Sequence, residues 1–290
     1  YEYRAMMDEQ IFDGIDDELD ISKDLSFDIR RELHAKPSLS NRDARPAPSG
    51  PISGKVEDYS DGPGPAVTGI RPTPFSFSDP TRIPPRPWIY GKHLIRGYVA
   101  TTIAPGGVGK STLTVAEAVA MASGRRLLAD APHEPLRTWL WNGEDDDDEL
   151  RRRVTAAMLR FGVTSEEIGD RLYVDSGRNS PIKIGSIESG KILIATPVVE
   201  RLEEVIRENR IDVVIVDPFV SVHSLPENSN EAMDAAVKTF AGIAHRTRCA
   251  FDLVHHSRKL NGTEADIDAA RGGSAIAAAV RSARVLNPMA

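Results

Sequence analysis

Apolar residues in the middle of the chain recur at two spacings, one typical of strands and one typical of helices. Runs rich in β-branched and other apolar residues, the pattern of buried strands, occupy residues 98–104, 137–142, 172–175, 211–217, 249–256 and 283–286. Apolar residues at helical spacing occupy residues 111–122, 151–161, 197–210, 231–246 and 271–281. Strands that alternate with helices in this way predict an α/β fold with a mostly parallel central sheet and helices on both faces.

The first eighty residues have a different pattern. Residues 1–36 are acidic, with apolar residues at loose helical spacing, so a short amphipathic helix and a disordered acidic arm fit equally well. Residues 37–87 contain 12 of the 20 prolines, which predicts a linker; a segment that clasps the next domain or a neighbouring subunit is the alternative. We expect an arm at 1–36, a linker at 37–83 and a folded domain at 84–290. Because the chain lacks an initial Met and stops soon after its last expected strand, we also expect an excerpt from a longer product.

The segment Ala104-Pro-Gly-Gly-Val-Gly-Lys-Ser-Thr112 lies between the first expected strand and the first expected helix. It matches the phosphate-binding loop pattern G-x-x-x-x-G-K-[ST], with Ala104 at the position of the first glycine. Glycines let the backbone amides of such a loop approach phosphates closely, and the helix N-terminus adds positive potential. Lys110 supplies a charge for the β- and γ-phosphates, and the Ser111 hydroxyl is a candidate Mg²⁺ ligand. We therefore expect ATP and Mg²⁺ as cofactors, with the phosphates held by Gly106, Gly107, Val108, Gly109, Lys110, Ser111 and Thr112.

Two acidic residues stand at the ends of expected strands. Asp217 ends the apolar run 211–217, and an acid at this place after a phosphate loop organises Mg²⁺, often through water. Glu144 follows the second expected strand, at the edge where an open α/β sheet binds its ligands. The acidic residues at 145–149 and the arginines at 151–153 are explained by the dipole and the exposed face of a helix. Glu144 and Asp217 are therefore the candidate site residues of this region.

Other polar and aromatic residues allow two interpretations each. His255 and His256 end a strand, where neighbours face opposite sides, so at most one of them points at the nucleotide; we expect a polar sensor rather than a metal site. Cys249 is the only cysteine and is expected to be a buried strand residue, since no nucleophile motif surrounds it. Trp88 and Tyr90 are expected to cover the edge of a core, with stacking on adenine as the alternative.

Charge and hydropathy narrow the environment. The formal net charge is −7, but residues 88–290 are nearly balanced, with 25 Lys and Arg against 27 Asp and Glu. This argues against a broad nucleic-acid surface while leaving room for a local basic channel. No apolar run approaches the roughly 20 residues of a membrane span, and the first residues show no apolar signal segment. We expect a cytoplasmic location, which the single cysteine suits, and no membrane partner.

The motifs occur in an order that resembles the RecA-like ATPases of the RepA-type hexameric replicative helicase family, in its plasmid and prophage branch of AAA family ATPases. The resemblance covers roughly residues 84–286 and no part of the first eighty. It is carried by Arg86-Pro-Trp-Ile-Tyr-Gly91 with His93-Leu-Ile-Arg-Gly97, the phosphate loop, Asn142-Gly-Glu-Asp145 with Glu149-Leu-Arg-Arg-Arg153, Val213-Val-Ile-Val-Asp-Pro218, and Val254-His-His-Ser-Arg-Lys259 with Ala270-Arg-Gly-Gly-Ser-Ala275.

The resemblance implies a RecA-like fold and roles for four residues. Glu144 corresponds to the glutamate that polarises the attacking water, Asp217 to the acid of the Walker B motif, and His256 to a sensor of the γ-phosphate. Arg271 corresponds to an arginine that acts in trans on the ATP of a neighbouring subunit, which implies self-association as a homohexamer. A local ion pair at a helix start is the alternative for Arg271.

The resemblance also implies a nucleic-acid partner. In RecA-like motors the loop after the sensor touches single-stranded DNA, so Arg258 and Lys259 are candidate phosphate contacts, with ordinary solvated charges as the alternative. Three acids later in that loop, Glu264, Asp266 and Asp268, weaken the DNA assignment. We expect an ATP-hydrolysing, ring-forming DNA helicase of plasmid or phage replication. The alternative is an ATP-switched DNA-associated regulator, or a recombination and repair accessory ATPase, that unwinds nothing. A small-molecule kinase is disfavoured because the sequence shows no lid arginine cluster or acceptor site.

Overall fold

The computed structural model describes residues 72–257 and 273–287. The chain divides into two units, Tyr1–Phe75 and Ser76–Ala290, and the elements below belong to the second. In chain order they are η1 (Pro80–Arg82), β1 (Trp88–Tyr90), β2 (Leu94–Ile95), β3 (Val99–Ala104), α2 (Lys110–Ser123), β4 (Thr138–Asn142), α3 (Asp147–Phe161), α4 (Ser165–Ile168), β5 (Leu172–Ser176), β6 (Gly185–Glu188), β7 (Lys191–Ile194), α5 (Thr196–Glu208), β8 (Val213–Asp217), η2 (Phe219–Val222), α6 (Asn230–Thr247), β9 (Ala250–His256), α7 (Gly273–Ala279) and β10 (Ser282–Val285).

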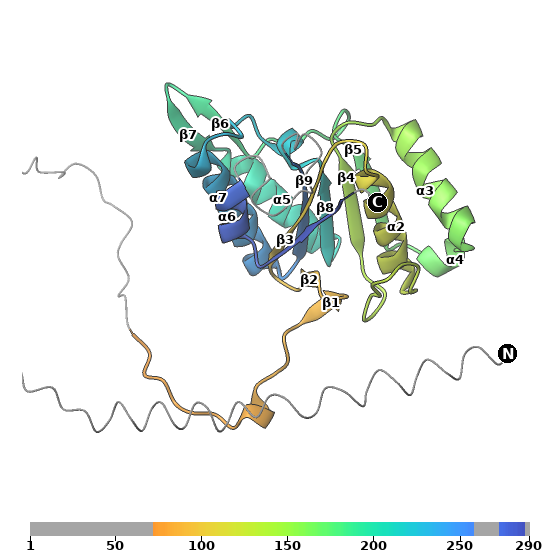
Figure 1. Cartoon of the computed structure of the whole chain (residues 1–290), viewed down its shortest axis with the longest axis horizontal. Helices are drawn as coiled ribbons and strands as arrows, with labels where there is room; N and C mark the ends of the chain where they lie inside the picture. Colours follow the sequence, from red (N-terminus) through yellow and green to blue (C-terminus); the bar gives the residue numbers. More distant parts are fainter. Residues whose placement is uncertain (1–71, 258–272, 288–290) are drawn as a thin grey trace, which may run out of the picture. The chain divides into compact units, whose positions relative to one another are not determined.

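Six strands form a central sheet in the order β10-β3-β9-β8-β4-β5, and every neighbouring pair is parallel (Figure 1). The predicted α/β fold with a mostly parallel sheet is therefore confirmed. β9 lies between β3 and β8, so the strand before the phosphate loop does not pair with the strand that ends at Asp217. With neighbouring strands about 4.8 Å apart, the carboxyl ends of β3 and β8 stand roughly 10 Å apart, with the end of β9 between them.

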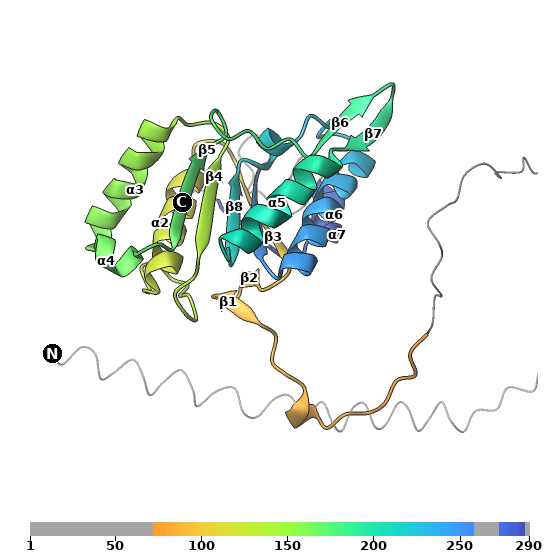
Figure 2. The same ribbon diagram turned by 180° about the vertical axis from the view of Figure 1, so that it is seen from behind.

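Helices cover both faces of the sheet, and this explains the composition of the strands. Strands buried on both sides read as continuous apolar runs, as in β8, where all five residues are buried. One face packs against α2, with α3 and α4 beyond it, and the other packs against α5, α6 and α7 (Figure 2). Alternate residues of β9 serve the two cores: Ala250 and Val254 pack on the α2 side, and Phe251 and Leu253 on the α6 side.

The helix boundaries near the site follow the expected signals. α2 ends at Gly124, which is left-handed (φ 74°). α3 begins where Asp146 caps it, with its side chain accepting a hydrogen bond from the Glu149 backbone N–H at 2.9 Å. Acidic residues fill the first turn, as the helix dipole favours, and the left-handed Gly162 ends the helix. After β5 the chain forms a hairpin, the antiparallel pair β6–β7.

The structure shows where the aromatic residues and the cysteine lie whose roles the sequence alone did not decide. Tyr90 is buried in the core against α2, where the edge-of-core interpretation put it, while Trp88 is half-buried beneath the guanidinium of Arg86. Cys249 is buried immediately before β9, and this burial raises the pKa of its thiol. Within residues 72–257 and 273–287, no helix has the length and apolar character that crossing a membrane requires.

Candidate nucleotide-binding site

The phosphate loop joins β3 to α2 at the carboxyl edge of the sheet. Gly107 (φ 81°) and Gly109 (φ 89°) have left-handed backbones that favour glycine, and Gly109 is the N-cap of α2. Gly106 does not have a positive φ. A Cβ built on any of these three glycines would have no atom within 4 Å, so the space above the loop is open. The loop is therefore shaped and cleared for an anion at a helix N-terminus.

Lys110 reaches back over this loop. Its side chain is buried, and Nζ donates to the carbonyl of Pro105 at 2.9 Å and to that of Ala104 at 3.4 Å. Burial lowers the pKa of the Lys110 ammonium, and the negative charges of Asp217 and Glu144 oppose that change. A triphosphate in the loop would supply stronger acceptors than these two carbonyls, so the ammonium is poised to exchange them for phosphate oxygens.

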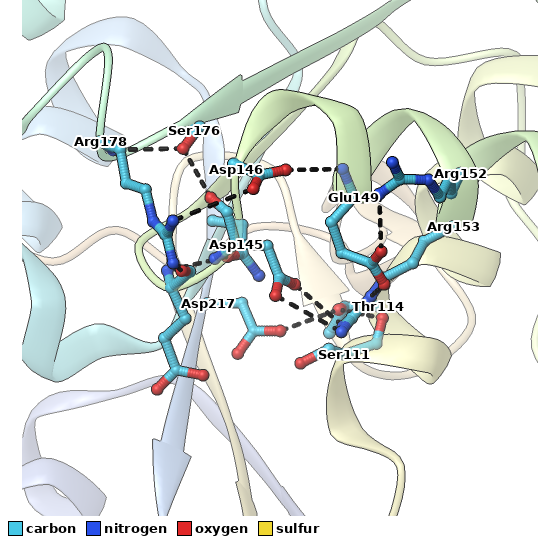
Figure 3. A network of polar contacts seen from close by, with 12 residues as sticks. Ser111, Thr114, Asp145, Asp146, Glu149, Arg152, Arg153, Ser176, Arg178 and Asp217 are labelled. Atoms are coloured by element: carbon cyan, nitrogen blue, oxygen red, sulfur yellow. Dashed lines mark hydrogen bonds and ion pairs between the residues drawn. The ribbon is translucent and has the colours of Figure 1, made fainter.

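Asp217 is the last residue of β8 and lies on the buried side of the site. Its side chain is 3% exposed and accepts hydrogen bonds from the hydroxyls of Ser111 and Thr114, the latter at 3.4 Å (Figure 3). Burial raises the pKa of the Asp217 carboxyl, opposed by the Ser111 hydrogen bond and the charge of Lys110. A buried carboxylate beside a hydroxyl is an oxygen donor set of the kind that Mg²⁺ accepts, so Ser111 and Asp217 fit a magnesium ion.

The turn that carries Glu144 is tied to the same strand edge. β4 and β8 pair in parallel with Asn142 opposite Asp217, and the Gly143 N–H donates to the Asp217 carbonyl at 2.9 Å. The Asn142 side-chain oxygen accepts from the backbone N–H groups of Glu144 at 2.9 Å and Asp145 at 2.8 Å. These bonds fix the backbone of Glu144, whose carboxylate is exposed to solvent beside the phosphate loop.

Gly143 is required here by close approach. A Cβ at this position would lie 2.2 Å from Cβ and 2.5 Å from Oγ of Ser221, in η2. Arg178 holds the turn from the other side, because its guanidinium donates to the Glu144 carbonyl at 2.7 Å. The Glu144 turn is thus clamped between two other segments of the chain.

The two histidines of β9 face opposite sides of the sheet. His256 lies opposite Ala104 in the pairing with β3, and strand alternation puts it on the face of Ala250 and Val254, which is the face of α2. His255 points the other way and packs edge-on against Phe219, with the ring centroids 6.0 Å apart. The structure thus places His256 at the carboxyl edge, next to the start of the phosphate loop.

Arg153 is a site residue that the sequence analysis assigned to a helix face. Arg151 and Arg152 are exposed, but Arg153 is half-buried and bonds to Glu149 at 2.9 Å and Asp145 at 3.0 Å. These contacts hold its guanidinium near Asp217 and the start of α2 (Figure 3). A signal for this placement was available: Arg153 comes three residues after Leu150 and four before Ala157, both on the packed side of the helix.

Three predicted residues, Arg258, Lys259 and Arg271, lie outside the described residues. Val108 and Thr112 complete the phosphate loop as expected from the chain order, Val108 half-buried and Thr112 exposed. In the described ranges, His, Cys, Asp and Glu form no group of three or more that could hold a metal ion. The structure thus brings Lys110, Ser111, Glu144, Asp217 and His256 to one edge of the sheet.

A parallel sheet with the phosphate-loop strand and the Asp217 strand on either side of β9, and this set of residues at its edge, defines a nucleotide-binding P-loop domain of the ATPase type. A comparison with known families matches residues 66–262 to the family described as AAA domain. Because the match covers more than half of the chain, the protein belongs to that family. This family match does not distinguish RepA-type helicases from the other members of the family. No curated protein matches the chain.

Proposed function

We propose that this P-loop domain hydrolyses ATP with Mg²⁺, and that a ring of its copies uses the energy to move along single-stranded DNA in plasmid or phage replication. One observation carries the hydrolysis: Glu144 and Asp217 stand at the ends of paired strands, joined through the Gly143–Asp217 hydrogen bond, beside the phosphate loop. The ring and the DNA rest on the ordered motifs shared with RepA-type helicases.

The residues divide the chemistry among themselves. Lys110 and the loop amides hold and neutralise the phosphates, and Ser111 with Asp217 would hold Mg²⁺. Bound Mg²⁺ would neutralise charge that develops on the phosphates during transfer. Glu144, exposed and fixed at its backbone, is placed to orient a water and accept its proton. His256, beside Ala104, is placed to respond to the γ-phosphate.

The test is steady-state ATP turnover, with and without single-stranded DNA, in the wild type and in Glu144→Gln. Loss of a general base predicts a fall in turnover on the order of 10²–10⁴-fold. ATP affinity should stay within a few-fold, since no hydrogen bond described for the phosphate loop involves the Glu144 side chain, which acts on Lys110 only through its charge. Glu200→Gln, an exposed glutamate of α5 far along the chain from these motifs, is the matched control and should turn over ATP as the wild type does.

The DNA and ring proposals have their own outcomes. Stimulation of turnover by single-stranded DNA, a ring-sized mass by light scattering and separation of a forked duplex would support the motor. ATP turnover that single-stranded DNA does not change, together with no separation of the duplex, would refute the motor proposal and favour an ATP-switched regulator. Full activity of Glu144→Gln would refute the proposed role of Glu144.

A further inference from the structure

The connection between β5 and β6, residues 177–184, packs directly against the turn that follows β4. The Gly177 N–H donates to the Asn142 carbonyl at 2.7 Å. A Cβ built on Gly177 would lie 2.5 Å from the Trp141 ring and 3.0 Å from Cα of Gly143. A side chain at Gly177 would therefore force the 177–184 connection and the turn apart.

The first end of the 177–184 connection holds the backbone of this turn. The Arg178 guanidinium donates to the Glu144 carbonyl through Nη2 at 2.7 Å and through Nε at 3.1 Å. The preceding Ser176 hydroxyl donates to the Asp145 carbonyl at 2.6 Å (Figure 3). Because Asn142 accepts from the N–H groups of the same two residues, the amide and the carbonyl of both are held.

The second end of the connection holds η2. The Lys183 ammonium donates to the Ser221 carbonyl at 2.7 Å and to the His223 carbonyl at 3.4 Å. The Ile184 N–H donates to the Val222 carbonyl at 2.8 Å. Hydrogen bonds from a charged donor to a backbone carbonyl are stronger than those between neutral groups, so Lys183 is a strong tie between the connection and η2.

η2 links this second contact to the other acid of the site. It begins at Phe219, two residues after Asp217, and the Ser221 N–H donates to the Pro218 carbonyl at 3.0 Å. The Ser221 side chain also fills the space beside Gly143. The 177–184 connection therefore holds the turn of one acid at its start and the segment that follows the other acid at its end.

We infer that the 177–184 connection fixes Glu144 relative to Asp217, and that Arg178 and Lys183 are positioning residues for ATP hydrolysis. This inference rests on the proposed function, because it takes Glu144 as the general base. In the part of the chain that the structure describes, no hydrogen bond joins either cation to the phosphate loop. Loss of Arg178 or Lys183 should therefore disturb the orientation of Glu144 and spare the binding of phosphates.

The experiment measures kcat for ATP turnover, and the Kd of a non-hydrolysable ATP analogue with Mg²⁺, in Lys183→Met and Arg178→Met. Because a misplacement of about 1 Å can cost on the order of 100-fold in rate, we expect each variant to lower kcat about five- to hundredfold. The Kd should stay within twofold. Lys183→Arg keeps the charge and should recover most of the turnover. Lys191→Met, at an exposed lysine of β7, is the matched control and should resemble the wild type.

A double-variant comparison separates positioning of the base from a general defect of the fold. In the Glu144→Gln background the base is absent, so Lys183→Met and Arg178→Met should change the remaining single-turnover rate less than twofold. A general defect would lower the rate by the same factor in both backgrounds.

Three outcomes would overturn the inference. Both variants could turn over ATP within twofold of Lys191→Met, they could slow Glu144→Gln as much as they slow the wild type, or their loss of turnover could follow a loss of affinity for the analogue. If one variant binds no analogue, the other decides. Full turnover by Glu144→Gln, or none by the wild type, would instead refute the proposed function, so the two failures are distinguishable.

Discussion

The carboxyl of Asp217 is buried at the end of β8. Burial raises the pKa of its carboxyl above that in the unfolded chain, so the folded state holds the proton more tightly. A raised folded pKa contributes stability that is fully present below the unfolded pKa and is lost as the pH rises through the folded pKa. At neutral pH the ionised side chain therefore costs folding free energy in the nucleotide-free protein.

Asp217→Asn should consequently stabilise the free protein while removing Mg²⁺-dependent turnover. A relief of about 1 kcal/mol would raise the Tm by roughly 2–4 °C for a domain of this size. Thermal unfolding at pH 7 measures it, and the difference should shrink as the pH falls toward the raised pKa. Glu200→Gln, at an exposed acid of α5 for which no ion pair is described, should leave the Tm unchanged. A Tm for Asp217→Asn below that of the wild type at pH 7 would contradict this account.

The turn after β4 is an element whose shape depends on one missing side chain. Gly143→Ala would put a Cβ 2.2 Å from Cβ of Ser221, so the turn or η2 must move. Because this turn positions Glu144, we expect turnover to fall at least tenfold with ATP affinity little changed. Steady-state kinetics with direct ATP binding separates the two effects.

Ser221→Gly removes both atoms that the new Cβ would meet most closely, and it supplies the control. The Gly143→Ala/Ser221→Gly double variant should recover most of the lost turnover, whereas Ser221→Gly alone should resemble the wild type. A double variant as slow as Gly143→Ala would show that the clash with Ser221 is not the cause.

Most elements could be predicted because their signals are local. The apolar run of β8, the spacing of α2 and the glycines that end α2 and α3 are all visible in the sequence. The strands and the helix that the sequence analysis did not predict are short. β1 and β2 have three and two residues and depend on tertiary packing, and α4 has a single turn. Its capping box, Thr164 with Glu167, was the one sequence signal for α4.

The residues of the candidate site could be predicted where a sequence motif fixes the backbone. They were harder to predict where the packing of one element against another determines which side chains reach the site. Lys110 and Asp217 follow from the phosphate loop and the end of a buried strand. The orientation of Arg153 depends on how α3 rolls against α2, and the Ser221 contact joins segments nearly eighty residues apart. The Ser221 contact leaves no local pattern, so the sequence analysis could not find it, whereas the spacing of Arg153 from Leu150 and Ala157 was a local signal that the sequence analysis did not use.

Over the whole domain, a buried ionic cluster joins the last strand to the helix that begins at the phosphate loop. Arg284 of β10 bonds to both carboxylate oxygens of Glu117 in α2, at 2.5 and 2.6 Å, and to Asp252 of β9 at 3.3 Å. Glu117 and Asp252 are almost fully buried. Burial raises the pKa of the Glu117 carboxyl, and the bonds from Arg284 oppose that change.

Arg284→Met should destabilise the domain by about 3–5 kcal/mol, because it leaves the buried Glu117 carboxylate without its bonded cation and leaves Asp252 with only its contacts to His93 and Thr102. Urea unfolding at pH 7 measures the loss. Arg201→Met, which breaks exposed ion pairs of α5, should produce no comparable change and serves as the control. Near-wild-type stability of Arg284→Met would mean that solvent reaches the cluster.

The order of the strands has a consequence for how the protein acquires its activity. β3 and β9 pair across about 150 residues of chain, and the hydrogen bond from Thr101 to Leu253 spans 152. Contacts of such sequence separation form slowly, so the strand edge that holds the nucleotide exists only once the central pairings are complete. Nucleotide then selects the finished sheet over every partly folded form. At a hundred times its Kd it would add about 2.7 kcal/mol to the stability of that sheet, making ATP a folding ligand as well as a substrate.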